Sequence, residues 1–82
     1  MDIEWSARSR KDLRALRNYI GQDSPHYARR FVARIIDNVE KLTEFPEVGR
    51  KVPEAEDHED VRELIFQGYR IIYCTSPTIF IL

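Results

Sequence analysis

The strongest constraint on the fold is a wide apolar stripe that follows residues 24 and 25. Ser24 before Pro25 is typical of a helix N-terminus, because serine caps free N–H groups and the first helical position needs no N–H. Apolar residues then recur at helical spacing: Ala28, Phe31, Val32, Ile35, Ile36, Val39 and Leu42. Their arc covers roughly 140° of the helix surface, more than one neighbour requires. This helix should therefore contact both a second helix and a sheet.

A strand and another helix are predicted before it. Residues 1–5 alternate apolar and acidic side chains, which indicates a short strand. Ser6 is a suitable N-cap for a helix over residues 7–20, and Gly21 should end it. Only three or four residues separate the two helices, so we expect an antiparallel helical hairpin.

The first helix carries two stripes. Leu13, Leu16 and Ile20 form an apolar one, and roughly 100° away lies an arginine stripe. The arginine stripe consists of Arg10, Arg14 and Arg17. It is either a solvated helix face or a surface that binds an acidic partner.

The last third of the chain reads as strands. Residues 61–66 and 69–74 flank Gln67-Gly68, a hairpin turn signal in which glycine supplies positive φ. Residues 78–82 predict a further strand. A two-residue loop would pair Phe66 with Tyr69, Leu64 with Ile71 and Arg62 with Tyr73, and would turn these six residues towards the helices. The opposite face would then carry Val61, Glu63, Ile65, Arg70, Ile72 and Cys74, with Glu63 and Arg70 as a diagonal pair of opposite charges. We predict this second face, together with the arginine stripe, as a partner-binding surface.

The segment "FPEVGRKVPE", residues 45–54, joins the helices to the sheet. Phe45 should close the apolar stripe of the second helix, and Pro46 should end that helix. Gly49 should permit the turn towards the sheet. Arg50 can then reach a carbonyl at the helix end or a strand carboxylate, with Glu63 as the candidate. We interpret the segment as a structural joint and not as a phosphate-binding turn.

The predicted element order is β-α-α-β-β-β, an α+β fold with a helical hairpin on one face of a small antiparallel sheet. We expect residues 1–82 to form a single domain. The chain stops at Leu82 inside an apolar strand, which indicates a shortened C-terminus.

Composition argues against several classes of function. Residues 1–51 carry a charge of +3 and residues 52–82 a charge of −4, so the chain lacks the basic balance of a nucleic-acid-binding domain. The single cysteine, Cys74, suits a reducing cytoplasm, and no apolar run is long enough for a membrane span. No spacing of His, Cys or acidic residues suggests a metal site or another cofactor.

The one enzymatic alternative is metal-free RNA cleavage. Such a reaction needs a proton-transferring group and cations that stabilise charge on the phosphate. The available residues are Arg50, Arg62, Arg70 and Tyr73. Because Arg62 and Arg70 are predicted on opposite faces of the hairpin, we expect no enzymatic activity.

Four segments in order resemble the ParE branch of the RelE/ParE superfamily of toxin–antitoxin toxins. They are "IEWSARSRKDLRALRNYI", "SPHYARRFVARIIDNVEKL", "FPEVGRKVPE" and "VRELIFQGYRIIYC", and together they cover almost the whole chain. The resemblance implies a cytoplasmic toxin of a plasmid-stabilisation type II system. It also implies a co-encoded, ParD-like antitoxin that neutralises the toxin.

The resemblance also bears on the target. ParE-like members are reported to inhibit DNA gyrase, whereas RelE-like members cleave mRNA on the ribosome. The nuclease branch places lysines at the positions of Val61 and Glu63 and an arginine at that of Arg70, and only the arginine is present here. We therefore expect a gyrase inhibitor, with a ribosome-dependent mRNA interferase or a non-toxic antitoxin-binding relative as the alternatives.

Overall fold

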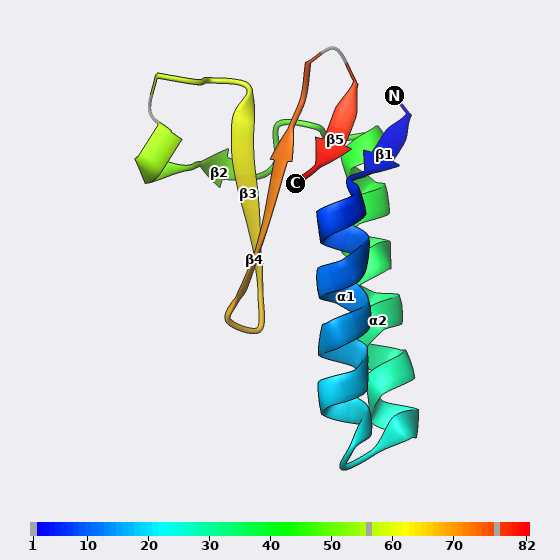
Figure 1. The fold of residues 1–82 in the computed structure, drawn as a ribbon. Helices are drawn as coiled ribbons and strands as arrows, with labels where there is room; N and C mark the ends of the chain where they lie inside the picture. The colour runs from blue at the N-terminus through cyan, green and yellow to red at the C-terminus, as the bar shows by residue number, and fades with distance from the viewer. Residues whose placement is uncertain (1, 56, 77) are drawn as a thin grey trace.

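Two helices pack beside a five-stranded sheet in the computed structural model, which describes residues 2–55, 57–76 and 78–82 (Figure 1). The elements are β1 (Ile3–Trp5), α1 (Ala7–Gly21), α2 (Pro25–Glu40), β2 (Arg50–Lys51), β3 (Val61–Phe66), β4 (Tyr69–Cys74) and β5 (Ile79–Ile81). Single 3₁₀ turns cover Lys41–Thr43 and Pro53–Ala55. The architecture is α+β, as the sequence predicts.

Side-chain caps start both helices where the sequence places them. The Ser6 hydroxyl accepts a hydrogen bond from the Ser9 N–H at 3.0 Å, and the Ser24 hydroxyl accepts one from Tyr27 N–H at 3.2 Å. The end of α2 differs from the prediction, because the helix stops at Glu40 and tightens into the 3₁₀ turn well before Pro46. Proline therefore lies beyond a helix that has already ended.

The sheet is mixed, and the prediction of an antiparallel sheet was wrong in this respect. The strand order is β1-β5-β4-β3-β2, with β1 parallel to β5 and the other pairs antiparallel. Alternation within β1 shows that it is a strand but carries no information about which strand it pairs with. The two-residue strand β2 was not predicted, because two residues are too few to show a period.

The β3–β4 hairpin has the predicted register. Phe66 pairs with Tyr69, Leu64 with Ile71 and Arg62 with Tyr73. Both turn residues have positive φ, +48° at Gln67 and +86° at Gly68, as a two-residue hairpin requires. The face that carries Leu64, Phe66, Ile71 and Tyr73 packs against the helices.

The core lies between α2 and this face. Its buried members are Phe31, Ile35, Val39, Leu42, Tyr73, Ile79 and Ile81. Val32 and Ile36 lie on the flank of the same stripe and are only half-buried. The wide arc of α2 therefore serves two contacts, one with the sheet and one with α1. None of the helices in the described parts of the chain has the length and apolarity to cross a bilayer.

Candidate functional site

A groove between α1 and α2 combines an apolar floor with an arginine rim. It has a volume of about 440 Å³ and is lined by Trp5, Arg10, Leu13, Arg14, Arg17, Val32 and Ile36. The arginine stripe of the first helix thus lies beside the half-buried flank of α2. Within residues 2–55, 57–76 and 78–82, none of these three arginines forms an ion pair. The floor of this α1–α2 groove is hydrophobic, and its rim is positively charged.

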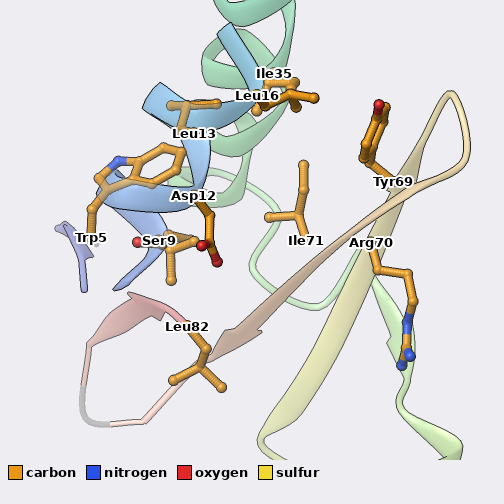
Figure 2. Close-up of a pocket in the computed structure, with 11 residues that line it drawn as sticks. Trp5, Ser9, Asp12, Leu13, Leu16, Ile35, Tyr69, Arg70, Ile71 and Leu82 are labelled. Atoms are coloured by element: carbon orange, nitrogen blue, oxygen red, sulfur yellow. The ribbon is translucent and has the colours of Figure 1, made fainter. Parts of the chain in front are cut away.

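A second groove lies between α1 and the free side of β4 (Figure 2). Its volume is about 340 Å³, and most of its lining is apolar: Trp5, Leu13, Leu16, Ile35, Tyr69, Ile71, Ile81 and Leu82. Ser9, Asp12 and Arg70 complete the lining. The Ile71 side chain points towards α1, whereas the Arg70 side chain extends to the other side of the strand (Figure 2). Trp5 and Leu13 also line the first groove, so α1 has a groove on each side.

The face of the sheet turned away from the helices holds a buried carboxylate. Glu63 is only 1% exposed, and each of its oxygens accepts a hydrogen bond of 2.6 Å, from Arg50 Nε to Oε1 and from Arg70 Nε to Oε2. Arg70 also donates from Nη2 to Glu54 at 2.8 Å. Both contacts of Glu63 were anticipated from the sequence, one as a diagonal strand pair and one as the role of Arg50.

These contacts shift the pKa values of Glu63 and Arg70. Hydrogen bonding from Arg70 is the main cause that lowers the pKa of the Glu63 carboxyl, and the Arg50 bond acts in the same direction against the cost of burial. The pKa of Arg70 is raised, first by its hydrogen bond to Glu54 and then by that to Glu63. The contacts therefore favour the charged forms of Glu63 and Arg70, and the guanidinium groups of Arg50 and Arg70 are directed at carboxylates.

The loop before β2 is fixed by Tyr73. Its hydroxyl donates to the Pro46 carbonyl at 2.9 Å and accepts from the Gly49 N–H at 3.0 Å. A Cβ at Gly49 would lie 2.5 Å from this hydroxyl and 2.7 Å from the Glu63 carbonyl, so the position requires glycine because of close approach. Arg62 Nη1 donates to the Gly49 carbonyl at 2.9 Å. The loop is therefore held in place by side chains of the sheet.

Phe45 does not close the stripe of α2, and that prediction was wrong. The side chain is 61% exposed, because α2 ends at Glu40 and the intervening 3₁₀ turn changes the direction that the helical wheel assumes. Phe45 instead lines a shallow hollow with Val48, Leu64 and Ile65.

Comparison with protein families assigns the chain to a known family. The family model described as the ParE toxin of the type II toxin–antitoxin system parDE matches residues 3–82. The chain belongs to the ParE toxin family. It is also similar to a curated protein named Toxin RelE2 from Caulobacter vibrioides, with 44% identity over 48 residues. The match covers 58% of this chain and 54% of that protein, so it spans about half the length of the curated relative.

In this ParE family member the candidate nuclease residues do not converge. Arg50 and Arg70 are bound to Glu63 on one face of the sheet, while Arg62 is bound to loop carbonyls on the other. Burial is the main cause that raises the pKa of Tyr73, and its hydroxyl is already hydrogen-bonded twice. Each of these four side chains makes at least one hydrogen bond within the fold.

The predicted partner face of this ParE toxin is partly covered by its own ion pairs. Glu63 lies beneath Arg50 and Arg70, Ile65 is 51% exposed, and Val61, Ile72 and Cys74 are half-buried. Burial is the main cause that raises the pKa of the Cys74 thiol. Among the described residues, no cluster of His, Cys, Asp and Glu is arranged to hold a metal ion.

Both grooves were missed by sequence analysis as sites, although the arginine stripe was found. The sequence does not show which apolar residues remain half-exposed after folding. A stripe wider than one contact requires, as in α2, is the feature that could have indicated the α1–α2 groove.

Proposed function

We propose that this chain is a toxin that a co-encoded antitoxin neutralises by docking in the α1–α2 groove. The observation that carries the proposal is the combination of an apolar floor with three arginines free of ion pairs within the described ranges. Such a groove suits an amphipathic acidic helix, whose apolar face fills the floor while its carboxylates meet the rim. Family membership implies that the partner is encoded beside this chain, and a ParD-like protein is the proposed identity.

A charge reversal tests the groove. Arg14→Glu should weaken binding of the neighbour-encoded protein by about tenfold or more, because a rim cation becomes a repelling anion. Lys11→Glu is the matched control, since Lys11 is an exposed α1 residue that does not line the groove. Isothermal titration calorimetry at about 0.1 M salt gives the dissociation constants of both variants. Equal losses in the two variants would contradict docking at this groove and would indicate a general charge effect.

We further propose that the toxin acts in the cytoplasm by inhibiting DNA gyrase through binding. The support is that Arg50, Arg62, Arg70 and Tyr73 are all committed to structural contacts, which leaves binding surfaces as the means of action. Purified gyrase in a supercoiling assay provides the test. If a folded toxin leaves supercoiling unchanged at micromolar concentration, gyrase is not its target.

The name of the curated relative keeps a RelE-like mRNA interferase as the second candidate. Primer extension on translated mRNA distinguishes the two functions. Codon-phased cuts that depend on the toxin would establish the nuclease and reject gyrase inhibition as the main activity.

A further inference from the structure

The net charge of the chain hides an uneven distribution between its helices and its sheet. Residues 7–40, which form the helical hairpin, hold eight Lys or Arg and four Asp or Glu, a charge of +4, whereas the rest of the chain carries −5. The acidic segment between β2 and β3 lies at the edge of the sheet far from α1 and α2 (Figure 1). A polyanion can therefore approach the helical hairpin from the side opposite this acidic segment.

Two adjoining hollows on the helical hairpin share Arg17. The α1–α2 groove has Arg10, Arg14 and Arg17 at its rim, and a hollow of about 450 Å³ beside the turn between the helices has Arg17, Asn18, Gln22 and Arg29 in its lining. We call the run of Arg10, Arg14, Arg17 and Arg29 the arginine furrow. All four residues are exposed, and none of them forms an ion pair within the described ranges of the chain. Their guanidinium groups are therefore available to an external anion.

The spacing of these cations suits a row of anions better than a single one. With the rise and turn of an α-helix, Arg10, Arg14 and Arg17 lie within about 60° of one another and span about 10 Å along α1. One strand of duplex DNA carries a phosphate for about every 3.4 Å of its axis, so this span covers about three phosphates. Arg29 continues the row onto α2, and the amides of Asn18 and Gln22 can donate hydrogen bonds to phosphate or sugar oxygens.

We propose that the arginine furrow of the free toxin binds the phosphate backbone of duplex DNA. The choice of duplex DNA rests on the proposed gyrase target, because a toxin bound to gyrase lies beside the duplex that the enzyme supercoils. We expect no sequence preference, since contacts with phosphates carry no sequence information. A docked antitoxin would cover the rim of the α1–α2 groove, so the contact with DNA belongs to the toxin without its antitoxin.

Fluorescence anisotropy of a fluorescein-labelled duplex of about 24 base pairs tests the furrow without gyrase or antitoxin. The full chain is titrated to about 100 µM at salt concentrations from about 25 to 150 mM, a range in which phosphate contacts give a measurable salt dependence. We expect saturable binding that weakens as salt rises. The slope of log affinity against log salt should be about −3, because about three phosphates are neutralised.

Two double variants with the same loss of charge locate the contact. Arg14→Gln/Arg17→Gln should weaken binding by about tenfold or more and make the salt slope shallower by about two, because two phosphate contacts are lost. Arg30→Gln/Arg34→Gln is the matched control, since both residues are exposed on α2 and line neither hollow. Its affinity should stay within about threefold of wild type and its slope within about one. Circular dichroism verifies that both variants are folded.

Several outcomes would overturn the proposal. They are the absence of binding at the highest protein and lowest salt concentration, and equal weakening in the two double variants. Single-stranded RNA of the same length that binds tenfold more tightly than the duplex would reject the assignment to DNA. Because gyrase is absent from these measurements, a toxin that inhibits supercoiling but does not bind the duplex would reject the DNA contact alone and leave the proposed target standing.

Discussion

At the scale of single residues, polar side chains hold the sheet to its loop. Tyr73 is buried in the core, yet its hydroxyl fixes two backbone groups of the loop, at Pro46 and Gly49. The sequence showed Tyr73 as a member of the helix-facing side but gave no sign of its hydrogen bonds. It did indicate the pairing of Arg50 and Arg70 with Glu63, because strand register places opposite charges within reach.

Tyr73→Phe should lower the free energy of unfolding by about 1–3 kcal/mol, because the buried Gly49 N–H loses its acceptor. Tyr19→Phe is the control, since Tyr19 is 69% exposed and its change should stay within about 0.5 kcal/mol. Urea denaturation followed by circular dichroism measures both. Equal stabilities of the two variants would show that the Tyr73 hydroxyl does not stabilise the loop.

Glu63 should make the protein less stable in acid. Its folded pKa lies below the ordinary value of 4.5, so the stabilisation is complete above that pH and is lost as pH falls through the lower folded pKa. Stability measured from pH 7 down to 3 should therefore drop less steeply in Glu63→Gln than in wild type. Glu44→Gln, at an exposed site, should keep the wild-type slope. Parallel curves for all three proteins would contradict this role of Glu63.

At the scale of secondary-structure elements, local sequence signals predicted the helices and the hairpin. The pairing between distant segments was visible only in the structure. Ser6, Ser24 and Gln67-Gly68 act through neighbours a few residues away, so the sequence displays their effect. The parallel contact of β1 with β5 joins opposite ends of the chain. Phe45 was misplaced because a helical wheel cannot show where a helix ends.

The hairpin turn gives a test at this scale. Gly68→Ala should destabilise the protein by about 1–2 kcal/mol, since φ is +86° there and no neighbouring atom lies within 4 Å of a new Cβ. Gly21→Ala is the control, because a Cβ there makes an ordinary 3.7 Å contact with Ala28 at the end of α1. That change should be neutral or stabilise by up to about 1 kcal/mol. Thermal unfolding measures the change in stability of both variants. A loss of stability in Gly21→Ala as large as that in Gly68→Ala would contradict this expectation.

At the scale of the whole molecule, the α+β architecture and toxin family were predictable, but the grooves on either side of α1 were not. Grooves depend on which apolar side chains remain uncovered after packing, and spacing alone does not determine that. We propose that the protein acts through its surfaces and not through a catalytic cluster, and the ion pairs of Arg50 and Arg70 with Glu63 support this proposal.

The most direct test of this central claim is a gyrase supercoiling titration with wild-type toxin and Arg70→Ala. In the family resemblance, Arg70 is the one residue that matches a nuclease position, so the variant shows whether inhibition requires that side chain. The account predicts that both folded proteins inhibit supercoiling with half-maximal concentrations within about threefold of each other. Failure of the folded wild type to inhibit, or abolished inhibition in a folded Arg70→Ala protein, would contradict it.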